Sequence, residues 1–143
     1  MINDLNRFQE AQERQYSKAF EEIKNGKKNS HWMWYIFPQI AGLGSSEMSR
    51  IYAVRDIAEA ERYLAHPVLG ARLISISRLL LSANIKTAHE IFGSPDDLKL
   101  RSSMTLFASV KNTDPVFQQV LDQYFGGEKD AKTVEILRRG QTF

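Results

Sequence analysis

The sequence contains no cysteine among its 143 residues. This absence excludes disulfide bonds, thiolate nucleophiles and cysteine-ligated metal sites, and it fits a protein of the reducing cytoplasm. Histidine is also scarce: His31, His66 and His89 are the only three, and no two of them share the i, i+4 spacing of a helical metal site. We therefore expect no metal ion, and nothing in the sequence indicates another cofactor.

Strong charge and long apolar runs are absent as well. The formal net charge is only +2, whereas general nucleic-acid-binding proteins carry a concentrated basic face. The longest apolar stretches, near Trp32–Phe37 and Leu79–Leu81, are much shorter than the roughly 20 residues that cross a bilayer. No basic segment followed by an apolar run opens the sequence, so we expect no signal peptide. These absences argue against nucleic acid and membranes as partners and favour the cytoplasm.

What remains is the composition of an ordinary globular domain. Hydrophobic residues make up 43% of the chain, which is typical of a folded protein, and a chain of this length can bury a core as one unit. No repeat, linker or low-complexity segment divides the sequence. We therefore predict a single domain over residues 1–143.

Apolar residues recur at helical spacing along most of the chain. From Asn3 to Asn25 they repeat every three or four residues, which predicts a long first helix. Capping and first-turn signals indicate later helix starts at Ser46, Asp56 with Glu59, His66-Pro67, Thr87 with Glu90, Ser94-Pro95, Asp114-Pro115 and Asp130. The pattern predicts a compact all-α bundle of six to eight helices with short connections.

One segment, residues 30–46, breaks the helical pattern. It contains both tryptophans of the chain, Trp32 and Trp34, and its proline and two glycines disfavour a long helix. We expect an irregular aromatic loop that packs on the core, with a short strand at Trp34–Phe37 as the alternative. Its aromatic side chains would either fill the core or line a binding pocket, and both interpretations stay open.

Within this segment, Gly42-Leu43-Gly44-Ser45-Ser46 has features of a phosphate-binding loop. Glycines let backbone amides point toward an anion, and a helix start favours negative charge. The loop lacks the lysine and third glycine of established phosphate motifs. A plain loop that ends in a helix cap is therefore the simpler interpretation.

A second group of polar residues occupies an expected helix interior at residues 98–107. Ser102, Ser103 and Thr105 are unfavourable there because their hydroxyl groups compete for backbone hydrogen bonds. Such residues are tolerated at a polar cavity, a close helix contact or a ligand. Lys99 and Arg101 add positive charge nearby, although close helix packing with solvated basic residues is the simpler interpretation.

His31 is the one histidine whose neighbours suit catalysis. It lies between Ser30 and Trp32 and close to Lys27, and a histidine in such a setting can act as a general base. The alternative is a structural role in which the ring nitrogens bond to nearby backbone. We expect His66 to cap a helix.

Together these motifs resemble the bacterial "domain of unknown function 1810" family, from about Leu5 to Thr133. The resemblance depends most on Ser30-His31-Trp32-Met33-Trp34 and on Ser102-Ser103-Met104-Thr105-Leu106-Phe107. Further matching residues are Arg7-Phe8, Gly42-Leu43-Gly44, Tyr52-Ala53, His66-Pro67, Ile91-Phe92-Gly93, Lys99-Leu100 and Asp130 with Thr133. The resemblance implies a compact all-helical cytosolic protein, and it brings no assigned activity or ligand.

These observations predict a pocket formed by the segments Ser30–Gln39, Gly42–Ser46 and Lys99–Thr105. It would bind a small anionic or nucleotide-like ligand, in a binding protein or an enzyme. The candidate ligand-binding residues are Lys27, Ser30, Trp34, Gln39, Ser46, Lys99, Ser102 and Ser103, and the candidate catalytic residue is His31. The alternative is a protein-interaction module or homodimer that uses Trp32–Phe37 and performs no catalysis.

Overall fold

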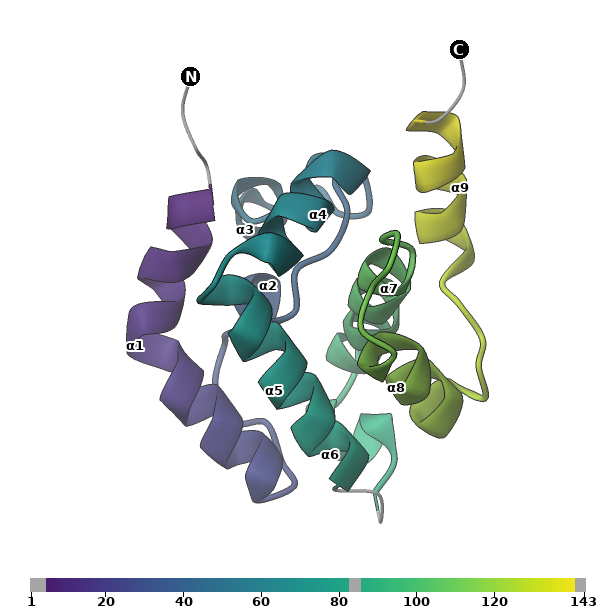
Figure 1. The fold of residues 1–143 in the computed structure, drawn as a ribbon. Helices are drawn as coiled ribbons and strands as arrows, with labels where there is room; N and C mark the ends of the chain where they lie inside the picture. The colour runs from purple at the N-terminus through teal and green to yellow at the C-terminus, as the bar shows by residue number, and fades with distance from the viewer. Residues whose placement is uncertain (1–4, 83–85, 141–143) are drawn as a thin grey trace.

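The computed structural model describes residues 5–82 and 86–140, and this part of the chain folds into nine helices (Figure 1). They are α1 (Leu5–Lys24), α2 (Met33–Ile36), α3 (Glu47–Ile51), α4 (Ile57–Ala65), α5 (Leu69–Ser82), α6 (Ala88–Phe92), α7 (Asp96–Ala108), α8 (Val116–Phe125) and α9 (Ala131–Gly140). The described residues contain no strand, and Ile40 and Val54 form an isolated bridge. The predicted all-α class is therefore confirmed, while the predicted helix start at Asn3 lies outside the described residues.

The ninth helix, beyond the predicted six to eight, is α2, which lies where the sequence predicts a loop or a strand. The Ile36 amide is 3.1 Å from the Trp32 carbonyl oxygen, and the Phe37 amide is 3.1 Å from that of Met33. Positions 32, 33, 36 and 37 are all buried, and this spacing matches one face of a helical turn rather than one face of a strand. Pro38 follows directly and stops the turn. The strand alternative is therefore wrong.

Local capping signals account for several helix starts. The Ser46 hydroxyl accepts a hydrogen bond from the Ser49 amide at 3.2 Å, and Thr87 and Glu90 form both bonds of a capping box. His66 Nδ1 accepts two backbone amides before and at the start of α5, at 3.1 and 3.2 Å. These side chains satisfy amides that the first helical turn leaves without a partner, which confirms the predictions at these positions.

Two predicted caps differ in their hydrogen bonds, although α4 begins directly after Asp56 as predicted. The Asp56 carboxylate accepts the Glu59 amide at 2.8 Å, but the Glu59 carboxylate accepts bonds from Arg55 and returns none to Asp56. At α7, the predicted cap Ser94 is replaced by Pro95, which makes no side-chain capping bond. At α4, the Glu59 carboxylate is engaged by Arg55 and by Arg7 of α1 instead.

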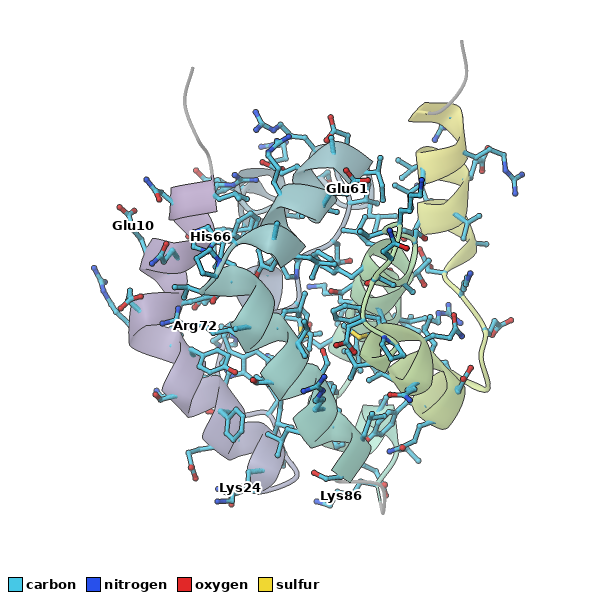
Figure 2. The ribbon with its side chains drawn as sticks, viewed as in Figure 1. Glu10, Lys24, Glu61, His66, Arg72 and Lys86 are labelled. Carbon is cyan, nitrogen blue, oxygen red and sulfur yellow. The ribbon has the colours of Figure 1, made fainter. Side chains whose placement is uncertain are left out.

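Helix α5 is the central helix of the bundle. It packs against α1 on one side and α8 on the other, and α7 in turn packs on α8 (Figure 1). Arg72 of α5 reaches α1, where its guanidinium lies 3.4 Å from Gln12 Oε1 and 3.2 Å from Glu13 Oε2. Glu10 and Lys24 point outward from the same helix α1 (Figure 2). Helix α1 therefore has one face joined to the bundle and one face in solvent.

The aromatic segment contributes mainly to the core. Trp32 and Phe37 are both 0% exposed, and both rings pack edge-on against Phe92, with centroids 6.3 and 5.9 Å apart. Trp34 is the exception, because it is only half-buried. The segment thus leaves little aromatic surface for a partner protein, and homodimerisation through it stays a prediction without a supporting exposed patch.

No helix among the described residues is by itself long and apolar enough to cross a membrane. Helices α4 and α5 reach the necessary length and composition only as a pair, and they are bent by 88° relative to each other. The apolar residues of α5, such as Leu73 and Ile76, are buried in the core.

Candidate functional site

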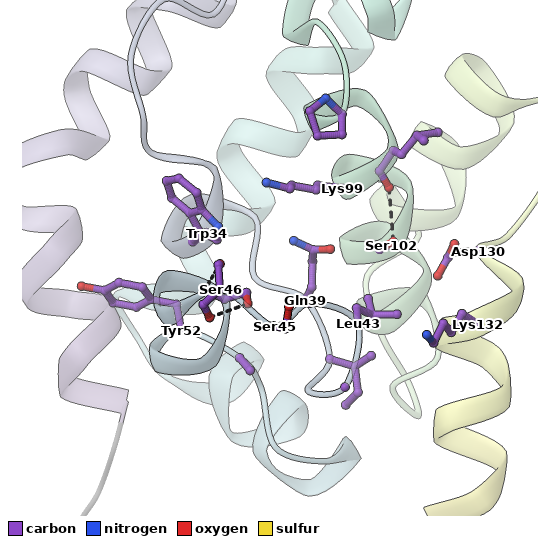
Figure 3. Close-up of a pocket in the computed structure, with 17 residues that line it drawn as sticks. Trp34, Gln39, Leu43, Ser45, Ser46, Tyr52, Lys99, Ser102, Asp130 and Lys132 are labelled. Atoms are coloured by element: carbon purple, nitrogen blue, oxygen red, sulfur yellow. Dashed lines mark hydrogen bonds between the residues drawn. The ribbon is translucent and has the colours of Figure 1, made fainter.

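A cavity of about 470 Å³ lies between α2, the first half of α7, the start of α9 and the loop that leads into α3 (Figure 3). This volume is within the range of small-molecule sites. The walls are formed by Trp34, Gln39, Ile40, Gly42, Leu43, Gly44, Ser45, Ser46, Ser49, Tyr52, Ala53, Pro95, Leu98, Lys99, Ser102, Asp130 and Lys132. The lining therefore combines aromatic and apolar side chains with hydroxyl groups and three charged groups.

Residues from all three predicted segments line this cavity. Trp34 and Gln39 come from α2 and the residues after it, Ser46 from the glycine-serine loop, and Lys99 and Ser102 from α7. Five of the eight predicted ligand-binding residues thus meet in one place. Since the segments are far apart in sequence, their meeting is the geometric condition that a shared binding site requires.

The other predicted site residues lie away from the cavity lining. Lys27 and His31 are exposed, and Ser30 bonds to α1 instead. Ser103 is fully buried in α7, and its hydroxyl group has no hydrogen-bond partner among the described residues. The geometry gives His31 no link to this cavity, so its role as a general base stays a prediction.

Glu22 of α1 explains the position of the Ser30-His31-Trp32 string. Its carboxylate accepts hydrogen bonds from the Ser30 hydroxyl at 2.6 Å, the Ser30 amide at 3.0 Å, the Asn29 amide at 2.8 Å and the Trp32 indole at 2.9 Å. Burial raises the pKa of Glu22, but these four bonds outweigh burial and lower the pKa to about 2. Glu22 therefore fixes the chain that leads into α2.

We expect Glu22→Gln to lower the free energy of unfolding at neutral pH by about 2 kcal/mol, because the amide keeps the side chain's shape but loses the charge that four donors share. The pKa in the folded state lies below the ordinary value of 4.5. The carboxylate therefore stabilises the fold fully above that value, and this contribution is lost as the pH falls from 4.5 toward 2.

Urea unfolding of both proteins across this pH range measures the effect. Stability should fall more steeply for the wild type than for Glu22→Gln. Glu21→Gln is the matched control, since Glu21 is the exposed neighbour on the same helix, and it should leave stability unchanged. Equal slopes for the wild type and Glu22→Gln would contradict the prediction.

Lys99 is held at the cavity wall by an aromatic ring and a carboxylate. Its Nζ lies 4.9 Å from the centroid of the Trp34 ring and 3.5 Å from Asp96 Oδ1. The other carboxylate oxygen of Asp96 is 2.8 Å from Lys28 Nζ, and the Lys28 side chain is 8% exposed. One carboxylate therefore faces two ammonium groups, which leaves net positive charge beside the cavity.

Asp130 and Lys132 bring the start of α9 to the cavity, and the predicted site does not include them. The Thr105 hydroxyl of α7 accepts a hydrogen bond from the Asp130 amide at 2.9 Å, and the Asp130 carboxylate accepts the Thr133 amide at 3.0 Å. The Asp130 and Thr133 pair is recognisable in the sequence as a helix cap. The contact with Thr105 is long-range, so no local pattern predicts that Asp130 reaches the cavity.

Comparison with known proteins gives two matches. Residues 2–137 match the family described as "Protein of unknown function (DUF1810)". The chain is also similar to the crystal structure of the conserved hypothetical protein Rv1873 from Mycobacterium tuberculosis, with 44% sequence identity and a TM-score of 0.92 over 94% of this chain and 96% of that chain. No curated protein matches the sequence. The chain therefore belongs to the DUF1810 family, as its motifs predict.

Proposed function

We propose that the cavity binds a small anionic ligand with a planar ring, as a nucleotide has. The observation that carries the proposal is the position of the Lys99 ammonium group, which lies beside the half-buried Trp34 ring on the cavity wall. An indole provides a stacking surface for a planar ring, and a lysine provides the compact charge that attracts a phosphate. The hydroxyl groups of Ser45 and Ser46 add polar contacts on the glycine-serine loop.

The charges around the cavity support an anion rather than a cation. Lys99 and Lys132 both line it, and Asp130 is the one acidic residue among the lining residues of this cavity. Because Asp96 lies between Lys28 and Lys99, it neutralises them only in part. The chain would act as a small-molecule binding protein or enzyme in the cytoplasm, the compartment that its cysteine-free composition fits.

Titration with AMP, followed by tryptophan fluorescence and by thermal shift, tests the proposal. A ligand that binds only the folded state raises the melting temperature. Stacking on Trp34 should also quench fluorescence, and that signal is assignable because Trp32 is 0% exposed. Lys99→Ala should weaken binding about tenfold, since a charge-assisted contact is lost.

Two variants serve as controls for this titration. Lys18→Ala removes an exposed lysine of α1 that does not line the cavity, and it should leave the affinity unchanged. Trp34→Phe keeps a ring at the wall, so it should abolish the quenching while retaining a thermal shift. If nucleotides, ADP-ribose, sugar phosphates and pyrophosphate at millimolar concentration all leave the melting temperature unchanged, the proposal is wrong.

A further inference from the structure

The cavity has two chemically different ends. Figure 3 shows Trp34, Tyr52 and Ser46 on one side and Asp130 on the other, with Gln39 between them. Trp34 provides an aromatic face at the first end. The Asp130 carboxylate lies at the second end, and the other charged residues that line the cavity are lysines.

Asp130 is held in place by bonds that use only one of its carboxylate oxygens. Oδ2 accepts the Thr133 amide at 3.0 Å and the Thr133 hydroxyl at 2.6 Å, and the Asp130 amide donates to the Thr105 hydroxyl at 2.9 Å. Oδ1 forms an ion pair with Arg101 Nη2 at 4.0 Å, which is longer than a hydrogen bond. The carboxylate is thus preorganised, and Oδ1 retains capacity to accept bonds.

A carboxylate in an anion-binding cavity imposes a requirement on the ligand. An ionised aspartate only accepts hydrogen bonds, and it repels a phosphate group placed against it. A purely anionic ligand would be repelled by this carboxylate and would form no hydrogen bond with it. A ligand that also carries hydroxyl groups can donate to Oδ1, and such a bond to a charged acceptor is stronger than a neutral one.

We infer that the ligand is a hydroxylated phosphate compound, a ribonucleotide or a sugar phosphate, and that Asp130 selects it by accepting a hydrogen bond from a sugar hydroxyl. This inference rests on the proposed anion-binding function of the cavity. Ser102 belongs to the same side of the cavity as Asp130 (Figure 3), and its hydroxyl oxygen can accept a second bond from the sugar. Asp130 is then the residue that sets specificity, while Lys99 attracts the charge.

Isothermal titration with four probes tests the inference: AMP, 2′,3′-dideoxy-AMP, ribose 5-phosphate and inorganic pyrophosphate. The wild type should bind AMP about tenfold more tightly than the dideoxy compound, since one charge-assisted bond is lost. Asp130→Asn retains the helix cap, because asparagine caps as well as aspartate. It should weaken AMP and ribose 5-phosphate while leaving pyrophosphate unchanged or tighter.

Glu135→Gln is the matched control, because it removes an exposed carboxylate of the same helix α9 that does not line the cavity. It should retain the preference for AMP over the dideoxy compound. If Asp130→Asn tightens all four probes alike, Asp130 only repels anions, and the inference is wrong. If the wild type binds pyrophosphate and shows no preference for the hydroxylated probes, the inference is also wrong, but the proposed anion site is supported. Absence of binding by every probe would refute the proposed function itself.

Discussion

Replacing Gly70 with alanine should lower the free energy of unfolding by about 3 kcal/mol or more and the melting temperature by roughly 10 °C. This change in stability is opposite in sign to the usual one, because replacing glycine with alanine inside a helix normally stabilises a protein by roughly 0.5–1 kcal/mol. Gly70 is buried in the first turn of α5. A Cβ added there would lie 2.1 Å from the Leu64 carbonyl oxygen of α4.

This clash cannot be relieved by rotating a side chain, because the atoms that the Cβ meets belong to the backbone. The carbonyl carbon of Leu64 would also be only 2.9 Å away. Helices α4 and α5 meet at this corner with a bend of 88°, so the alanine must force the corner open. Opening it would loosen the packing of Tyr63 and Leu69, which are both 0% exposed.

Gly140→Ala is the matched control for this substitution. Gly140 is also helical, and a Cβ at this position meets no atom of the described residues within 4 Å. Thermal and urea unfolding should therefore show Gly140→Ala to be as stable as the wild type or slightly more stable. Equal stability of Gly70→Ala and Gly140→Ala would contradict the prediction, because it would mean that the junction of α4 and α5 accommodates the added Cβ with little loss of stability.

Helix positions were predictable where the stabilising contacts are local. Ser46 and Thr87 cap helices through bonds to residues three positions later, so the sequence contains both partners of each contact. The sequence does not predict helix α2, for the opposite reason. One turn is too short for helical periodicity to be read, and its burial depends on Phe92 and other distant residues.

The candidate site was predictable only in part. Residue type alone indicates Trp34 and Lys99, since an aromatic ring and a cation beside hydroxyl residues suit a nucleotide. Ser30 is a candidate because it belongs to an unusual string, but its bond to Glu22 gives it a structural role. The hydrogen bond from the Asp130 amide to the Thr105 hydroxyl holds Asp130 at the cavity. No pattern in a single sequence connects these two segments.

Glu59→Gln should destabilise the fold by about 3 kcal/mol, as expected when a buried ion pair loses one charge. The Glu59 side chain is 1% exposed and lies 3.5 Å from Arg7 Nη2 and 3.0 Å from Arg55 Nη2. Burial raises the pKa of Glu59, but the bonds from Arg55 and the charge of Arg7 outweigh burial and lower it. The ionised carboxylate therefore joins α4 to α1.

The lowered pKa fixes the direction of the pH dependence. The carboxylate of Glu59 stabilises the fold above its ordinary value of 4.5, and this contribution is lost as the pH falls below that value. Urea unfolding at neutral pH measures the cost of Glu59→Gln directly. Glu61→Gln is the matched control, because Glu61 is an exposed residue of the same helix. If the two variants unfold at the same urea concentration, the ion pair does not stabilise the protein.

Arg7 connects this ion pair to the cavity. Its Nε donates to the Ile51 carbonyl and its Nη2 to the Ala53 carbonyl, both at 2.6 Å. Ala53 and Tyr52 line the cavity. The charge of Glu59 therefore helps to hold the guanidinium that anchors one cavity wall, and Glu59→Gln should loosen that wall.

Amide hydrogen exchange distinguishes this local effect from general destabilisation. The Val54 amide follows the anchored segment and donates to the Gln39 carbonyl at 2.8 Å, whereas Val120 lies in the core on α8. In Glu59→Gln, exchange at Val54 should accelerate more than exchange at Val120, because the wall opens without global unfolding. Equal acceleration of exchange at both amides would mean that Glu59 contributes only to overall stability. A selective increase at Val54 would mean that Glu59, which does not line the cavity, holds one of its walls in place. We would then expect Glu59→Gln to weaken AMP binding as well as the fold.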